Sequence, residues 1–281
     1  MDDDPLAAAA AMNHFTEEER QDILNDLLAL MGQDDRLSGV ILVGSAAEGF
    51  DDRFSDIDLS VVVDGEHEVA TLFDDWKTRI AALFPVLSVF EVAHSENMFL
   101  SGFLLTNILE LDIGFLSIKD LLAKQRRWKI VFDRSGQIEE IMRSSWENRE
   151  PSDRESEYRR RLDSIWHYIT HTALSIARGH RWRAIHYLDV VRVRSIELAC
   201  IRRNLDPHHF RPVHLLPPDF LDQLQGTLPK SAEETEIFRA LRASSELFFN
   251  ECSAIDQSLG KDLSSNLRAG MNSYLEMIRV Q

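Results

Sequence analysis

Two aspartates separated by a single residue are the part of this sequence best suited to carry chemistry. Asp56 and Asp58 lie in the run Ser-Asp-Ile-Asp-Leu at residues 55–59. Side chains alternate along a strand, so both carboxylates are expected on one face and the apolar residues on the other. Carboxylates this close repel each other unless a cation lies between them. Oxygen ligands of this kind suit Mg²⁺, which completes its coordination with water and substrate phosphates. The pair therefore predicts magnesium-dependent chemistry on a phosphate compound.

A glycine and a serine precede this pair, and ten residues separate Ser45 from Asp56. Gly44 and Ser45 follow the β-branched run at residues 39–43, so they are expected to end one strand and begin a short helix. The exposed backbone N–H groups and the dipole at the start of a helix attract phosphate groups. The Ser45 hydroxyl would add a further donor, which makes this segment a candidate phosphate site.

Together these two segments resemble the signature of the nucleotidyltransferase superfamily, which includes DNA polymerase β and the enzymes that modify antibiotics with nucleotides. The signature is an apolar residue, Gly, then Gly or Ser, followed after a short spacer by Asp, an apolar residue, Asp or Glu, and an apolar residue. Residues 43–45 and 56–59 match it. The small-molecule, aminoglycoside-type members are the most similar part of the superfamily.

The resemblance implies a reaction and a set of ligands. A nucleoside triphosphate such as ATP is the expected substrate. A hydroxyl group of the acceptor is expected to attack the α-phosphorus of the triphosphate and to displace pyrophosphate. Asp56 and Asp58 are expected to hold two Mg²⁺ ions, which clamp the attacking and leaving oxygens. Gly44, Ser45 and Ser55 are expected to bind the nucleotide.

The resemblance also implies a third carboxylate on a later strand, between two apolar residues. Asp112, in the run Leu-Asp-Ile at residues 111–113, fits that setting at the end of an expected hairpin. It would help to hold one metal ion and would either accept the proton of the acceptor hydroxyl or steer it away. Glu110 lies two residues earlier and therefore on the same face, so it remains a competitor for this position.

The elements around these residues predict an α+β domain at residues 15–150 with a mixed sheet. Thr16 and Glu19 form a capping box ahead of a helix that runs to about Met31, and a second helix is expected over residues 66–84. Alternating apolar residues indicate strands over residues 39–43, 57–63, 86–92, 99–105 and 108–116, with a short sixth strand at 129–132. Residues 1–14 are expected to form a flexible arm.

Beyond residue 150 the strand pattern ends and an all-helical domain is expected at residues 151–281. Helical patterns cover residues 154–178, 181–203, 217–226 and 231–256, with a last helix to about 280. The segment with Gly179, Trp182, Ala184, Asp189 and Arg192 resembles the C-terminal domain of aminoglycoside-type nucleotidyltransferases. From that resemblance Arg192 is a candidate nucleotide ligand; the alternative is a structural pair with a nearby acidic residue.

The charge and composition of the chain disfavour several classes of binding partner. A net charge of −16 and a pI near 5.0 disfavour long nucleic acids, which attract proteins with basic surfaces. Cys200 and Cys252 form no CxxC pattern, so a reducing cytoplasm is expected. The acidic start of the chain is unlike a signal peptide, and no apolar run is long enough for a membrane span. His167 and His171 lack the further ligands of a zinc site.

The leading hypothesis is an adenylyltransferase that modifies a small hydroxyl compound, such as an aminoglycoside-like or lincosamide-like antibiotic. Nucleotidylation of a protein or RNA, of the toxin–antitoxin kind, is a second hypothesis, and a silent nucleotide-binding module is a third. Many members of the superfamily carry an arginine shortly after the Gly-Ser pair, whereas this chain has Ala46, Ala47 and Glu48. The absence of this arginine is expected to affect the affinity for the triphosphate or the class of substrate. The sequence leaves the oligomeric state open.

Overall fold

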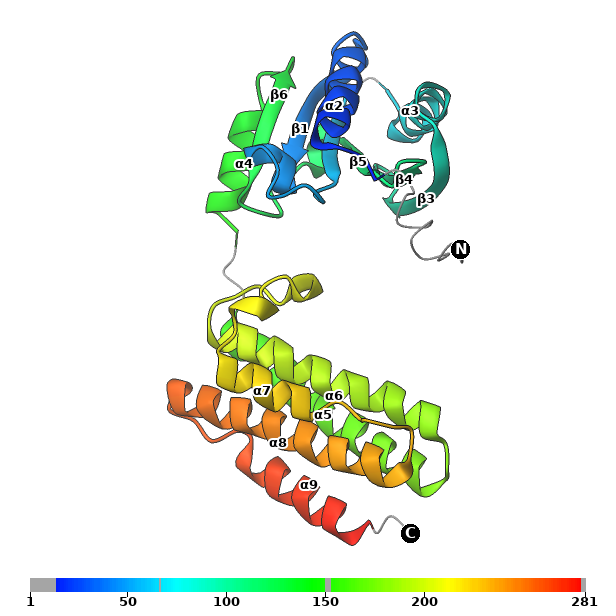
Figure 1. Ribbon diagram of the computed structural model, residues 1–281. Helices are drawn as coiled ribbons and strands as arrows, with labels where there is room; N and C mark the ends of the chain where they lie inside the picture. The colour runs from blue at the N-terminus through cyan, green and yellow to red at the C-terminus, as the bar shows by residue number, and fades with distance from the viewer. Residues whose placement is uncertain (1–13, 66, 150–152, 279–281) are drawn as a thin grey trace, which may run out of the picture. The chain divides into compact units, whose positions relative to one another are not determined.

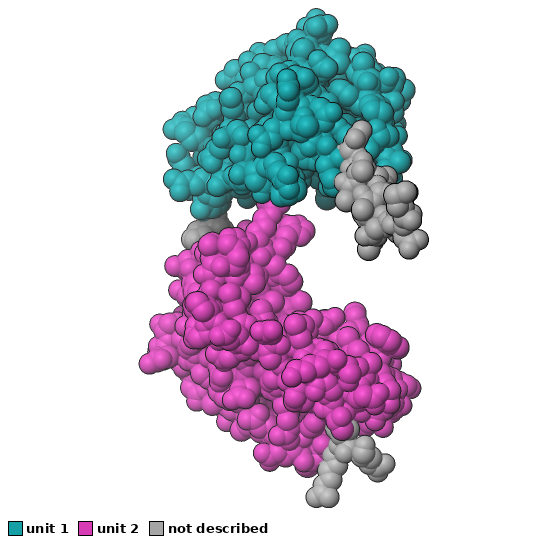
Figure 2. Space-filling model, in the orientation of Figure 1, with its two compact units in different colours: residues 1–149 teal, residues 150–281 magenta. Residues whose placement is uncertain are grey.

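The chain divides into two compact units, Met1–Arg149 and Glu150–Gln281 (Figure 2). The computed structural model describes residues 14–65, 67–149 and 153–278. The flexible arm expected at residues 1–14 lies outside the described residues except for His14, and the boundary expected at residues 150 and 151 lies outside them as well. The first unit combines helices with one sheet, and the described part of the second unit is helical, which confirms the expected α+β fold class.

The first unit is built on a mixed six-stranded sheet in the order β3-β4-β5-β2-β1-β6. β2 and β5 are parallel, and every other neighbouring pair is antiparallel. All six strands lie where the apolar pattern predicts them, with ends shifted by at most three residues. Their bounds are β1 Leu37–Val43, β2 Ile57–Val63, β3 Val86–Ser95, β4 Met98–Leu105, β5 Glu110–Ser117 and β6 Trp128–Asp133.

Two helices cover one face of this sheet (Figure 1). They are α2, Glu17–Met31, and α3, Val69–Leu83. The expected capping box begins α2, because the Glu19 N–H donates to Thr16 Oγ1 at 3.1 Å and the Thr16 N–H donates to Glu19 at 2.8 Å. Alternate residues of β2 and β5 are buried in the core beneath these helices: Ile57, Leu59, Val61, Val63, Leu111, Ile113 and Phe115.

The opposite face is covered by a helix that the sequence pattern did not predict. This helix, α4, spans Ile138–Glu147 and buries Ile138 and Met142. The carboxylate of Asp133, the last residue of β6, holds the turn that leads into α4, because it accepts hydrogen bonds from the Gly136 N–H at 2.8 Å and the Ile138 N–H at 2.9 Å. Gly39 of β1 leaves room for it, because an added Cβ there would lie 2.2 Å from Ile138 Cδ1.

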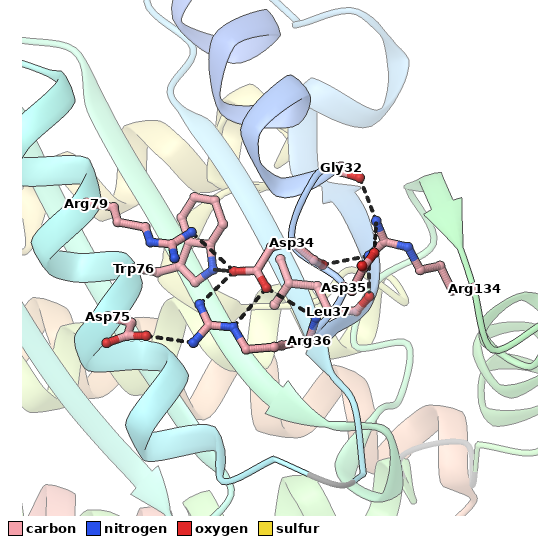
Figure 3. Close-up of polar contacts among 9 residues, drawn as sticks. All are labelled: Gly32, Asp34, Asp35, Arg36, Leu37, Asp75, Trp76, Arg79 and Arg134. Atoms are coloured by element: carbon pink, nitrogen blue, oxygen red, sulfur yellow. Dashed lines mark hydrogen bonds and ion pairs between the residues drawn. The ribbon is translucent and has the colours of Figure 1, made fainter.

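A network around Asp34 joins α2, β1 and α3 (Figure 3). Asp34 is buried and accepts hydrogen bonds from Arg36 at 2.8 and 2.9 Å, from Trp76 Nε1 at 3.1 Å and from Arg79 at 3.3 Å. Arg134, just after β6, donates to the backbone carbonyls of the same turn at 2.5 to 2.7 Å. The hydrogen bonds from Arg36 outweigh the desolvation of Asp34 and lower its pKa to about 2.

The described part of the second unit is a helical bundle around α5, α6 and α8. Its helices agree with the predicted segments apart from their ends, and the C-cap of α8 is Gly260, whose φ of 63° is left-handed. Cys200 and Cys252 are buried and unpaired. No helix in the described ranges has the length and apolarity needed to cross a membrane. The α-helices are α5 Arg154–Ala177, α6 Arg181–Arg202, α7 Pro218–Gly226, α8 Glu234–Leu259 and α9 Ser265–Met277.

Candidate active site

Asp58 and Asp112 face each other across two neighbouring parallel strands. Asp58 of β2 pairs in register with Asp112 of β5. The residues on either side of each aspartate are buried under α2 and α3, so strand alternation turns both carboxylates to the opposite face. Both line a cavity of about 280 Å³ on that face. The parallel pairing of β2 and β5 therefore brings together two carboxylates that are 54 positions apart in the sequence.

Gly44 brings the end of β1 against Asp58. Its φ is +63°, a left-handed conformation that favours glycine. A Cβ added at Gly44 would lie 2.6 Å from Asp58 Oδ2, so a side chain would displace the carboxylate. The short helix expected here is present as a 3₁₀ helix, η1, of five residues, Gly44–Glu48. A helix this short has a weak dipole, so η1 offers a phosphate its N–H groups but little further attraction.

Asp112 lies in an environment that penalises its charge. Burial, followed by the nearby carboxylates of Glu110 and Asp56, raises the pKa of Asp112 to about 6. Its Oδ1 atom is buried and accepts no hydrogen bond from the described residues. Glu110, the competing candidate, is exposed and does not line the cavity. Asp112, unlike Glu110, therefore lines the cavity with Asp58, and its role as the third carboxylate stays a prediction.

Asp56 lies immediately before β2 and is half-buried. Its charge contributes to the raised pKa of Asp112, although Asp56 itself is not among the residues that line the cavity. Within the described ranges, no group of three or more His, Cys, Asp or Glu side chains is arranged to hold a metal ion. The crowded carboxylates and the unbonded Asp112 oxygen nevertheless suit a divalent cation that takes its other ligands from water and phosphate.

The loop between η1 and Asp56 is held by Arg20, a residue that the sequence reasoning missed. Arg20 is buried, its guanidinium lies 3.9 Å from the centroid of the Phe50 ring, and Nη1 donates to the carbonyls of Asp52 at 2.9 Å and Ser55 at 2.8 Å. The Ser55 hydroxyl accepts a hydrogen bond from the Asp52 N–H at 3.2 Å. A signal was present, since Arg20 lies four residues before Leu24 on the buried side of α2.

In the second unit, Arg192 forms an ion pair with Asp189, which is the structural pairing considered from the sequence. Its Nη1 atom is buried and has no partner among the described residues. A role for Arg192 in nucleotide binding stays a prediction. His167 and His171 are adjacent, with ring centroids 4.2 Å apart. They belong to no metal-binding group among the described residues.

Paired aspartates on a mixed sheet, beside a tight Gly-Ser turn, are the arrangement expected of a nucleotidyltransferase. A family model described as streptomycin adenylyltransferase matches residues 17–278. The chain therefore belongs to this family and is a nucleotidyltransferase, which confirms the expected resemblance. A comparison with curated proteins gave no significant match.

Two solved structures are similar to the chain at low sequence identity. An aminoglycoside 6-adenyltransferase from Bacillus subtilis is 17% identical with a TM-score of 0.46, and the match covers 94% of this chain and 98% of that one. A nucleotidyltransferase-like protein from Exiguobacterium sibiricum 255-15 is 15% identical with a TM-score of 0.42, and the match covers 86% and 78% of the two chains.

Proposed function

We propose that this protein transfers AMP from ATP to a hydroxyl group of a small molecule and releases pyrophosphate. The proposed acceptor is an aminoglycoside-like or lincosamide-like antibiotic. The observation that carries the proposal is the register of Asp58 and Asp112 on parallel strands, with Gly44 packed against Asp58. Membership of the streptomycin adenylyltransferase family supports both the nucleotide and the class of acceptor.

Asp56, Asp58 and Asp112 are the residues that would hold Mg²⁺, as two ions in this proposal. Bound there, Mg²⁺ would neutralise the charge of the triphosphate and stabilise the attacking and leaving oxygens. The fit rests on the burial of Asp112, on the repulsion between Asp112 and Asp56, and on the buried, unbonded Oδ1 atom of Asp112. Carboxylates under such strain gain from a cation that compensates their charge.

The other residues would position the reactants. Gly44 and Ser45 would present backbone N–H groups and a hydroxyl to the phosphates, with Ser55 and Arg192 as further nucleotide ligands. Asp112 would also either accept the proton of the acceptor hydroxyl or steer it away, because a carboxyl group with a pKa of about 6 is largely ionised at neutral pH. In this proposal the domain at residues 15–150 carries catalysis, and the domain at residues 151–281 binds substrate and nucleotide.

The proposal can be tested directly. The protein is incubated with Mg²⁺, the four NTPs and a panel of antibiotics that includes aminoglycosides and lincosamides, and the products are examined by mass spectrometry. A nucleotide adduct on one antibiotic is the expected result. Labelling of a protein or RNA from α-labelled ATP would instead support macromolecular nucleotidylation, and nucleotide binding without pyrophosphate release would indicate a silent module.

Asp58→Asn provides the matched control. This variant should form no adduct, because one of the proposed metal ligands is lost. The metal-free variant should be as stable as the wild type or slightly more so, because the substitution relieves repulsion between carboxylates. Thermal unfolding without metal checks the stability. Adduct formation at the wild-type rate would reassign Asp58 to a role outside catalysis, and a collapsed fold would assign it a structural one.

A further inference from the structure

The cavity lined by Asp58 and Asp112 has a second wall, formed by the segment between β5 and β6. Among the described residues that line the cavity, those with a permanent positive charge are Lys124 and Arg127, and both belong to this wall. Asp120 of the same segment adds a third carboxylate to the lining. A polyanion entering this cavity meets three carboxylates, so cations on the facing wall would favour its binding in addition to any metal ion.

Arg127 is held by contacts that can be exchanged. Its Nη1 donates to both carboxylate oxygens of Asp51, at 2.8 and 3.0 Å, and its Nε lies 3.2 Å from Glu48 Oε2. All three side chains are about half exposed or more, at 47%, 61% and 62%. Ion pairs this exposed contribute little free energy, typically about 0 to 1 kcal/mol. A ligand with a higher negative charge can therefore displace the two carboxylates.

Lys124 lies on the same wall and has no such partner in the described part of the chain. It is exposed and forms no hydrogen bond or ion pair with any described residue. An ammonium group that lines a cavity without a protein partner is available to an incoming anion.

The ion pairs of Arg127 also place its guanidinium beside η1. Glu48 is the last residue of η1, and Asp51 follows three residues later. Within η1 itself the chain offers no cation, because the residues after Gly44 are Ser, Ala, Ala and Glu. The short η1 has little dipole of its own, so the positive charge opposite the carboxylates has to come from another element. The segment before β6 supplies it.

We propose that Lys124 and Arg127 form the cationic wall of the triphosphate site, and that Arg127 exchanges Glu48 and Asp51 for phosphate oxygens when nucleotide binds. This inference rests on the proposed function. The planar guanidinium of Arg127 binds two phosphate oxygens at once, while Lys124 acts as a point charge. The cavity, at about 280 Å³, is at the lower limit of small-molecule pockets. It therefore suits the phosphates rather than a whole nucleotide.

The test measures nucleotide binding to the full-length protein with Mg²⁺ and without acceptor, by calorimetry. Arg127→Ala and Lys124→Ala should each weaken ATP binding about tenfold or more, the effect of losing one charge-assisted hydrogen bond. Adenosine binding should change little, and inorganic triphosphate should compete with ATP on the wild type but poorly on the variants. Arg126→Ala is the matched control, because Arg126 is a neighbouring exposed arginine that does not line the cavity.

A second variant separates phosphate binding from a structural role of the same ion pairs. The double substitution Glu48→Gln with Asp51→Asn removes the ion pairs of Arg127 by changing its two acidic partners, and it leaves Arg127 itself unchanged. ATP affinity should then be kept or increased, because the competing carboxylates are gone. A loss of ATP affinity equal to that of Arg127→Ala would overturn the inference. Arg127 would then have the structural role of holding η1 in place.

The remaining outcomes distinguish the inference from the proposed function. Equal ATP affinity in the wild type, Arg127→Ala and Lys124→Ala would overturn the inference alone. A wild-type protein that binds neither ATP nor inorganic triphosphate would overturn the proposed function and the inference with it. Thermal unfolding of each variant confirms that a loss of affinity belongs to a folded protein.

Discussion

At the scale of single residues, the candidate active site contains a glycine that lets a carboxylate approach the backbone. Gly44 adopts a φ of +63°, and the space of its missing Cβ is occupied by Asp58 Oδ2, 2.6 Å from the ideal Cβ position. Backbone geometry and carboxylate position are therefore coupled at this point. A side chain here would be unfavourable for both reasons at once.

Gly44→Ala is expected to reduce kcat/KM by about a hundredfold, because the added methyl group moves Asp58 away from its position. The substitution should also lower the free energy of unfolding by roughly 1 to 2 kcal/mol, because alanine is strained in the left-handed conformation of this residue. Steady-state kinetics and urea unfolding measure the two effects. Gly226→Ala is the control, since a Cβ there has no neighbour within 4 Å. Wild-type kinetics in Gly44→Ala would contradict this account of the turn.

Asp112 makes the stability of the metal-free protein depend on pH. Its folded pKa of about 6 lies above the ordinary value of 3.8, so the folded state binds more protons than the unfolded state between these values. The free energy of unfolding therefore falls as pH rises through that window. At pH 7.5 the ionised carboxylate destabilises the fold.

Asp112→Asn should remove this penalty. The metal-free variant should be more stable than the wild type by about 1 kcal/mol at pH 7.5, a value reduced for the partial exposure of the group. Near pH 4 the two proteins should differ little, because the wild-type carboxyl is already protonated when folded. Urea unfolding with a chelator at both pH values measures the difference. A less stable variant at pH 7.5 would indicate that Asp112 forms a stabilising contact.

At the scale of elements, the turn before β1 is held by a buried carboxylate. Asp34 joins this turn to α3 through Arg36, Trp76 and Arg79, as Figure 3 shows. The folded pKa of about 2 lies below the ordinary value of 3.8. The contribution of the Asp34 carboxylate to the free energy of unfolding is therefore fully present above about pH 4 and is lost as pH falls through 2.

Asp34→Asn is expected to lower the free energy of unfolding by about 1 to 2 kcal/mol at pH 6, in proportion to the lowered pKa. The difference from the wild type should shrink as pH falls toward 2.5, where the wild-type carboxylate begins to protonate. Chemical unfolding at several pH values gives the comparison. Asp35→Asn is a suitable control, because Asp35 is almost fully exposed. A difference independent of pH would show that packing, and not charge, dominates at Asp34.

At the scale of the whole molecule, the formal charge is −16. If an acceptor is polycationic, as aminoglycosides are, this field should favour its binding at low ionic strength. Salt shortens the range of the field to a Debye length of about 10 Å at 0.1 M. The KM for such an acceptor should therefore rise with salt at saturating MgATP, while kcat stays constant. A KM that does not change with salt, or reaction with uncharged compounds alone, would contradict an aminoglycoside-like acceptor.

The sequence alone determined most of the fold and the core of the candidate site. Strands and helices differ in the period of their apolar residues, and this local pattern identified all six strands. The Gly-Ser pair and the two aspartates were also recognisable, because their spacing follows from a strand end, a short loop and the next strand. The apolar pattern did not predict helix α4, because this helix is only ten residues long and lies in a polar stretch between two segments with stronger apolar periodicity.

The tertiary structure decided which distant residues meet. Strand register places Asp112 beside Asp58, and packing places Arg20 under the Asp52–Ser55 loop. The same is true of Arg127, which lies 79 positions after Glu48 in the sequence yet pairs with it in the structure. The spacing of Arg20 from Leu24 indicates its buried side of α2 but not its partners, and Arg127 carries no periodic signal. Their partners are set by the long-range pairing of strands and the packing of loops, and a local sequence pattern contains no information about either.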